Sequence, residues 1–342
     1  GIFYMMVNIG GFIGPASSSY LRTTYGWKLI FIQASIVIGI NLLFLLHFYK
    51  EPYREETDKE SISKAISNSF KKIWEALKDT RLTVLLILMV GFWTMFNQLF
   101  YTLPNFITDW VDSSSMSLWI NENLPFLSNT LTENGQVKAE WFTNIDALMI
   151  VFLQIFVSYF VTKMRHVSAM IRGFIIAAIG VSLTFYTNNV MFTIIGTVIF
   201  AVGEMTTNPT FSAFIALISP RGKEALYQGT YFLPVAAGNF LTKLISGNLY
   251  QKWSDKLSLL QIELKSRGIE MPEISESFTK NDFFALAEQK LCMTHWEMTQ
   301  VLWDNYNPNK LWYVIFAIGA FTIIALSIYD KKVIRPREKN GN

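Results

Sequence analysis

Two ionisable side chains lie inside stretches of the chain that are otherwise apolar. Glu204 falls within residues 190–218 and Lys243 within residues 225–250. An ionisable side chain at the centre of a bilayer costs about 2.5–3.5 kcal/mol on insertion scales, so such residues usually line the path of an ion or a polar solute. If the two stretches are membrane helices joined by a short inner turn, a rise of about 1.5 Å per residue puts Lys243 about 6 Å farther out than Glu204, within reach of its long side chain.

The chemistry that this pair could perform is reversible proton binding. A buried carboxylate beside an ammonium stays ionised, whereas one that loses its partner gains a proton. A change of shape that separates Glu204 from Lys243 would therefore load a proton, and both residues are candidates for proton coupling. The alternative is a fixed ion pair that only joins two helices.

Composition indicates a membrane protein. Of 342 residues, 51% are hydrophobic and 16% are charged, whereas soluble domains are close to a quarter charged. The formal net charge is only +3 and the basic residues lie between apolar runs, so we expect no nucleic-acid partner. The single cysteine, Cys292, excludes an internal disulfide, and it shows no metal-ligand spacing with the three histidines, so we expect no metal and no cofactor. No Asn-x-Ser/Thr sequon occurs, which favours a bacterial cytoplasmic (inner) membrane.

Apolar runs of about 20 residues predict an all-α protein with eight transmembrane helices. The predicted spans are residues 2–22, 28–48, 82–110, 144–163, 168–187, 190–218, 225–250 and 311–330. Lysine and arginine gather in alternate connections, at residues 50–81, 163–172, 221–223 and 331–342. The positive-inside rule makes these connections cytoplasmic.

Five segments resemble the proton-coupled oligopeptide transporters, a branch of the major facilitator superfamily. They are residues 3–12 (FYMMVNIGGF), 92–98 (FWTMFNQ), 139–144 (AEWFTN), 203–209 (GEMTTNP) and 229–233 (GTYFL), which are similar to helices five, seven, eight, ten and eleven of that family. The resemblance implies a helical bundle of twelve helices in two halves, of which this chain supplies eight. Residues 1–49 would end the first half, 50–81 would link the halves, 82–330 would form the second half, and 331–342 would be a basic cytoplasmic tail. A WxxIF pattern at Trp27 and again at Trp312, six spans apart, agrees with two parallel repeats.

The resemblance also implies a binding site. Glu204 matches the acid that faces the amino end of a bound peptide, and Asn144 matches an asparagine that holds substrate. Asn97 stands where the family often has an acid, so this position can hydrogen-bond a substrate but cannot carry a proton. The implied substrate-binding residues are Glu204, Asn144, Asn97, Gln98, Tyr231 and Trp93. By position alone, Asp146 is expected to be solvated at the water boundary.

Two amphipathic segments lie outside the spans. Within the linker, apolar residues recur every three or four positions between lysines, which predicts a helix on the cytoplasmic membrane face, where binding of anionic lipids is an additional hypothesis. Two outer loops are expected, at residues 111–143 and 251–310. In the second, residues 279–306 read as one amphipathic helix that Thr279 and Asp282 cap, in an insert packed over the outer mouth.

Together these features predict a membrane transporter rather than an enzyme. The expected function is proton-coupled uptake of di- and tripeptides by alternating access, driven by the proton gradient, in a protein that works as a monomer among membrane lipids. One alternative is a major facilitator importer or drug-type exporter of another small solute, cationic ones included. A second is a non-transporting receptor or anchor. Glu204 should face an aqueous cavity in a transporter and be closed in by side chains in an anchor.

Overall fold

The computed structural model describes residues 2–50, 61–132 and 134–339, and this part of the chain is helical without a strand. The all-helical class is therefore confirmed. The α-helices are α1 (Ile2–Tyr25), α2 (Trp27–Phe48), α3 (Ile62–Ala76), α4 (Thr80–Phe96), α5 (Gln98–Tyr101), α6 (Leu103–Trp110), α7 (Ser114–Asn123), α8 (Ala139–Val161), α9 (His166–Tyr186), α10 (Val190–Ile218), α11 (Glu224–Thr230), α12 (Phe232–Leu244), α13 (Tyr250–Trp253), α14 (Lys256–Ser266), α15 (Lys280–Leu291), α16 (His295–Tyr306), α17 (Leu311–Tyr329) and α18 (Arg335–Lys339). Short 3₁₀ or π segments are η1 (Pro125–Thr130), η2 (Ile245–Leu249), η3 (Pro308–Lys310) and η4 (Asp330–Ile334).

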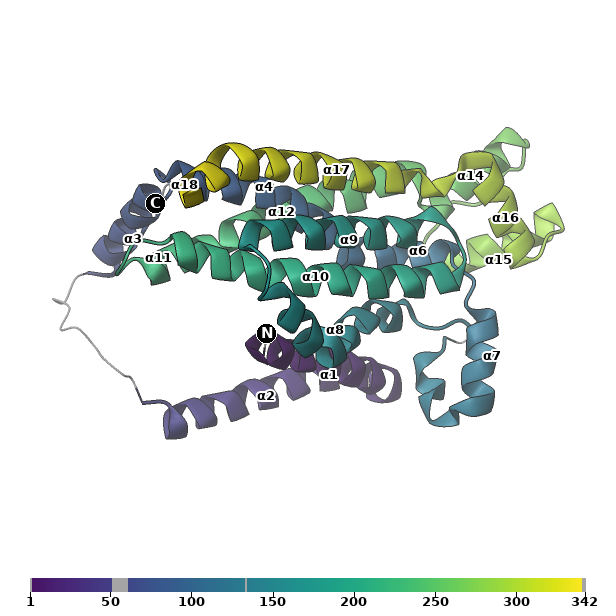
Figure 1. The fold of residues 1–342 in the computed structure, drawn as a ribbon. Coiled ribbons are helices and arrows are strands. Elements are labelled where there is room, and N and C mark those ends of the chain that lie inside the picture. The colour runs from purple at the N-terminus through teal and green to yellow at the C-terminus, as the bar shows by residue number, and fades with distance from the viewer. Residues whose placement is uncertain (1, 51–60, 133, 340–342) are drawn as a thin grey trace.

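The long helices run roughly parallel (Figure 1). Helices α4, α9, α10, α12 and α17 pack into one bundle, and α8 packs on α10 from one side and on α1 from the other. Helix α2 packs along α1, and none of its residues is buried. Helices α3 and α18 lie at one end of the molecule, and α14 to α16 lie at the opposite end (Figure 1).

Six described helical segments are long and apolar enough to cross a membrane. They are Trp27–Phe48, Thr80–Tyr101, Ala139–Val161, His166–Tyr186, Val190–Ile218 and Pro308–Glu338. The expected count of eight is not matched. Helix α1 is continuous, but its serines, glycines, Asn8 and Arg22 lower its hydropathy. The predicted span 225–250 is helical but divided among α11, α12, η2 and the start of α13, none longer than 13 residues.

The predicted span 82–110 is also interrupted. Helix α4 ends at Phe96, Asn97 and Thr102 flank the single turn of α5, and Pro104 stands in the first turn of α6. Proline lacks the backbone N–H that an interior helical position donates, so it is tolerated at a helix start and breaks the helix before it. The interruption lies beside Asn97 and Gln98, two of the residues implied to bind substrate.

Glycines allow α9 and α10 to approach closely. A Cβ atom on Gly180 would lie 2.3 Å from the backbone nitrogen of Phe200, and one on Gly203 would lie 2.3 Å from that of Ala177. Gly196 likewise faces the backbone of Gly180. Small residues at such a crossing let two backbones touch, which membrane helices use to gain dispersion contacts. This seam fixes the rotation of α10, the helix that carries Glu204.

The insert between α13 and α17 contains three helices. The predicted capping box of Thr279 and Asp282 is present at the start of α15. The prediction of one helix through residues 279–306 is wrong, because Cys292 adopts a left-handed conformation (φ 52°) and Thr294 with Glu297 forms a second capping box that starts α16. The helical spacing of apolar residues continues across a short turn when the two helices bury the same face. The spacing therefore did not reveal the break between α15 and α16.

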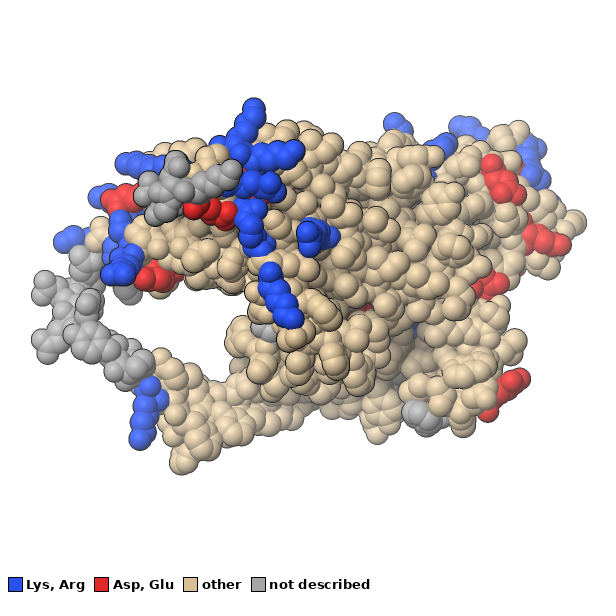
Figure 2. Space-filling model, in the orientation of Figure 1, with Lys and Arg blue, Asp and Glu red and all other residues tan. Residues whose placement is uncertain are grey.

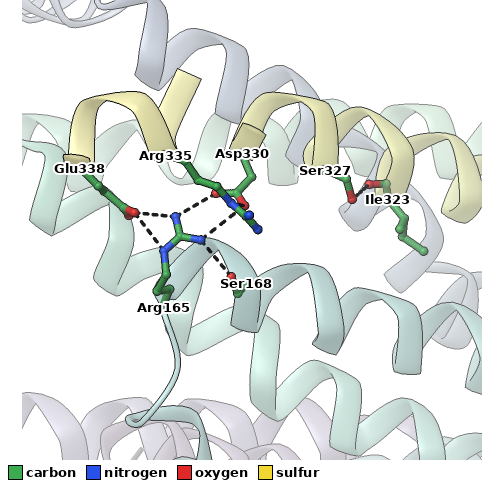
Figure 3. Close-up of polar contacts among 7 residues, drawn as sticks. All are labelled: Arg165, Ser168, Ile323, Ser327, Asp330, Arg335 and Glu338. Carbon is green, nitrogen blue, oxygen red and sulfur yellow. Dashed lines mark hydrogen bonds and ion pairs between the residues drawn. The ribbon is translucent and has the colours of Figure 1, made fainter. Parts of the chain in front are cut away.

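Charged residues join the elements at the end of the molecule that carries α18. The Arg165 guanidinium, just before α9, lies 3.1 Å from Asp330 and 2.5 Å from Glu338, and Arg335 lies 2.8 Å from Asp330 (Figure 3). Asp330 is only 2% exposed, so the two guanidinium groups balance a buried carboxylate. Lysine and arginine side chains gather over this end of the molecule (Figure 2).

The predicted linker is described only in part. Its amphipathic segment forms α3 as expected, whereas residues 51–60 lie outside the described residues. In the predicted tail, residues 331–339 continue as η4 and α18, and the final residues 340–342 lie outside the described part.

Candidate functional site

Glu204 is buried where α1, α8 and α10 meet, with 3% of its surface exposed. The Tyr4 hydroxyl donates a hydrogen bond to Glu204 Oε1. Asn208 donates from Nδ2 to the Tyr4 hydroxyl at 2.9 Å and accepts a hydrogen bond from the Tyr231 hydroxyl. A continuous chain of polar groups therefore runs from the joint between α11 and α12, through α10, to α1.

Local sequence explains why these groups meet. Glu204 and Asn208 are four residues apart and so lie on one face of α10. Tyr4 packs beside the apolar cluster of Ile150, Ala201 and Met205, which holds α1, α8 and α10 together. The Tyr4 end of the polar chain is therefore bordered by apolar side chains of α8 and α10.

A second carboxyl group lies against Glu204. Asp146 on α8 is 2% exposed, and its side chain interacts directly with that of Glu204. Asp146 Oδ1 and Glu204 Oε2 are both buried without a partner that satisfies hydrogen-bond geometry. The expectation that Asp146 is solvated at the water boundary is wrong. Its distance along the helix suggested a shallow position, but its side chain is buried against Glu204 of α10.

Lys243 does not contact the polar groups around Glu204. Its side chain is exposed on α12, and no ion pair connects it to Glu204 within the described residues. The predicted ion pair is therefore not formed in this conformation. The rise along a helix fixes the depth of a residue but not the direction in which it points, and α12 packs on α4 rather than on the Glu204 face of α10.

The other implied substrate-binding residues divide into two groups. Trp93 and Tyr231 contact each other edge to face with ring centroids 6.0 Å apart, so Trp93 borders the polar chain that leads to Glu204. Gln98 instead bonds along its own helix, donating to the Thr94 carbonyl at 3.0 Å and accepting from Thr102 at 2.5 Å. The first group lies beside Glu204's hydrogen-bonded neighbours, and Gln98 is engaged in the α4–α6 interruption.

Two buried asparagines complete the predicted set. Asn144 lies on α8, two residues before Asp146, and is 6% exposed. Asn97 is 7% exposed, and its Nδ2 atom is buried without a hydrogen-bond partner. The Trp93 Nε1 atom is also buried without a hydrogen-bond partner, so this side of the site holds two unsatisfied donors.

Sequence reasoning missed Tyr4, Asn208 and Asp146 as site residues. Asn208 had a detectable signal, because it falls one helical turn after the acid. Tyr4 and Asp146 had none that periodicity could supply, since each reaches Glu204 from a different helix. Among the described residues, no group of three or more His, Cys, Asp or Glu side chains could hold a metal ion.

Residues 1–120 match the family model described as Major Facilitator Superfamily. The match covers 120 of the 342 residues, so it is a likeness of that part of the chain to the superfamily. Together with six described helices that are long and apolar enough to cross a membrane, this likeness indicates a multi-pass membrane protein. The matched region contains Tyr4, Trp93, Asn97 and Gln98, and it ends before Asp146 and Glu204. The comparison with curated proteins found no match.

Proposed function

We propose that the protein is a secondary transporter that couples proton movement to the uptake of di- and tripeptides, with Glu204 and Asp146 as the proton-carrying pair. The observation that carries this proposal is the burial of two interacting carboxyl groups with no cation beside them in the described structure. Two adjacent carboxylates in a medium of low dielectric repel strongly, so the closed site retains at least one proton.

The same pair can release that proton when the site opens. Water that reaches Glu204 and Asp146 stabilises both ionised forms, and the proton then leaves toward the side that has opened. The Tyr4 hydroxyl donates to Glu204 Oε1 and supports the ionised form of that carboxyl. Proton binding would therefore be linked to closure, which is the coupling that alternating access requires.

A peptide ammonium can bind the carboxylate that stays ionised while the other carboxyl group of the pair holds the proton. A carboxylate accepts charge-assisted hydrogen bonds from an ammonium group, and Glu204 is the acid that the family resemblance aligns with the peptide amino end. Trp93 and Tyr231 supply aromatic surface beside it, and the Asn97 amide offers an unpaired donor. Another small cationic solute fits the same chemistry and is the main competing substrate class.

One observation favours the non-transporting alternative. Glu204 is closed in by Tyr4, Asn208 and Asp146, which is the arrangement predicted for an anchor. However, residues that only join helices bring together opposite charges or neutral donors and acceptors, whereas this site brings together two acids. A closed site is also one of the states through which an alternating-access transporter passes.

The proposal is tested with the whole protein in liposomes. Labelled di- and tripeptide entry is measured with and without an inward proton gradient, and peptide exchange is measured without any gradient. Glu204→Gln and Asp146→Asn should remove the response to the gradient, and Asp146→Asn should retain exchange. Asp304→Asn, at an exposed acid of α16, is the matched control and should behave as wild type.

Three results would count against it. Failure of wild-type protein to accumulate peptide under the gradient excludes proton-coupled peptide uptake. Gradient-driven uptake of a cationic solute in place of peptide would transfer the mechanism to the competing substrate class. Unchanged uptake in both Glu204→Gln and Asp146→Asn would remove the carboxyl pair from the mechanism.

A further inference from the structure

Helix α3 has an apolar face that the described protein does not cover. Ile66, Phe70 and Trp74 are 53%, 69% and 66% exposed. They recur every four residues, so they form one stripe along the helix. A contiguous exposed stripe that includes two aromatic side chains is unusual on a surface that faces only water.

The opposite edge of the same helix is fixed to the bundle. Ala76, at its end, is 3% exposed, and α3 packs on α11. The following Leu77 carbonyl accepts a hydrogen bond from Thr83 at 2.5 Å, and the Tyr227 hydroxyl donates to Asp79 at 3.3 Å. The rotation of α3 is therefore set by protein contacts, and it directs the apolar stripe away from the bundle.

Lysines border this stripe. Lys64, Lys71 and Lys78 are exposed and recur every seven residues, which is close to two turns at about 3.6 residues per turn. They therefore lie along one side of the helix and its C-terminal extension, next to the flank that carries Phe70 and Trp74. Within α3, acidic side chains are limited to Glu75. The surface is consequently an apolar stripe with a cationic border.

The position of α3 identifies what this surface meets. The helix ends at Ala76, and the span that begins at Thr80 follows directly, so the stripe lies where the chain enters the membrane. This is the end of the molecule at which basic side chains gather, and hence the cytoplasmic side (Figures 1 and 2). At that level an apolar stripe meets the boundary between headgroups and acyl chains, and lysines meet headgroups.

We propose that α3 is a docking surface for anionic phospholipids of the cytoplasmic leaflet. Ile66, Phe70 and Trp74 enter the headgroup boundary, and Lys71 and Lys78 contact anionic headgroups. A lysine near such a surface contributes about 1 kcal/mol, which is about fivefold in an equilibrium constant. Anionic lipid is favoured over a protein partner because the cationic border complements a negatively charged leaflet that lies at the same level. The inference does not depend on the transported solute.

The test places a spin label on α3 in the whole protein. In a Cys292→Ser background, Phe70→Cys reports on the stripe and Glu75→Cys reports on an exposed position across the helix. Both proteins are placed in nanodiscs of phosphatidylcholine alone and of phosphatidylcholine with phosphatidylglycerol. Collision of the label with oxygen measures exposure to lipid, and collision with a water-soluble nickel chelate measures exposure to water.

With phosphatidylglycerol present, the label at position 70 should collide with oxygen and be protected from nickel, whereas the label at position 75 should show the reverse. Removing the cationic border with Lys71→Gln and Lys78→Gln should lower the ratio of docked to undocked helix by about 25-fold, from two lysines at about fivefold each. Because these lysines are exposed, the substitutions leave the packed edge of α3 unchanged.

Three outcomes would overturn the proposal. Protection of position 70 from both reagents would show that protein covers the stripe, either a second copy or another segment. Nickel access in both lipid mixtures would show that the stripe faces water. Equal insertion in both mixtures, unaffected by the lysine substitutions, would show an apolar contact without selectivity for anionic lipid.

Discussion

Replacement of Gly203 by alanine should separate α10 from α9. The new Cβ atom would lie 2.3 Å from the Ala177 nitrogen, 2.5 Å from the Gly173 carbonyl oxygen and 2.7 Å from the Ala177 Cα, whereas ordinary contact begins at 3.4 Å. All three atoms belong to the backbone, so no side-chain rotation relieves the overlap, and the helices must move apart by about 1 Å. Overpacking of this kind costs about 1–3 kcal/mol.

The free energy of unfolding should fall by about 2 kcal/mol in total, because the higher helix propensity of alanine offsets at most about 1 kcal/mol of the overpacking. At about 2–4 °C per kcal/mol, the apparent melting temperature should fall by about 4–8 °C. Since Gly203 directly precedes Glu204, the shift should also reduce gradient-driven uptake. Thermal unfolding of the purified protein in detergent measures the first effect, and the liposome assay measures the second.

Gly39→Ala is the matched control, because it also lies within an apolar helix but has nothing within 4 Å of the added Cβ. It should melt at or slightly above the wild-type temperature. If Gly203→Ala unfolds like the wild type, or if Gly39→Ala is equally destabilised, then close backbone contact does not hold α9 to α10 and the reasoning fails.

Four further predictions concern other contacts. Arg165→Gln removes one of the two guanidinium groups beside the buried Asp330 carboxylate and should lower the free energy of unfolding by about 1–3 kcal/mol. The control is Arg172→Gln, which should leave the melting temperature unchanged because the Arg172 guanidinium contacts only a methionine sulfur among the described contacts. Tyr4→Phe leaves a buried carboxyl oxygen without its donor and should reduce gradient-driven uptake with normal protein yield, and unchanged uptake would contradict this role. Burial lowers the pKa of Lys256 to about 8, so between that value and about 10.5 only the unfolded state keeps the proton, and stability should rise with pH across this window. Lys256→Met should abolish that rise in a pH series of melting temperatures. Burial, followed by the nearby Lys256 ammonium, also lowers the pKa of His295, so stability should fall as pH drops below its usual value near 6.5.

The sequence by itself determined the class of the protein and much of its local structure. Apolar runs with few charges require helices in a membrane, because a spanning backbone must satisfy its hydrogen bonds internally. Local rules also placed the capping box of Thr279 and the helix of the linker, since each depends on residues within one or two turns. The buried acid at Glu204 was found for the same reason, as one charge in an apolar run.

Only the tertiary structure decided which groups meet that acid. Tyr4 and Asp146 reach Glu204 from helices far away in the sequence, while Lys243 at a similar depth is directed elsewhere. The physical reason is that helical rise fixes depth, whereas the rotation of each helix depends on contacts with its neighbours, such as the seam at Gly180 and Gly203. The partner of a buried charge is therefore a property of helix packing, and the sequence alone specified the charge but not its partner.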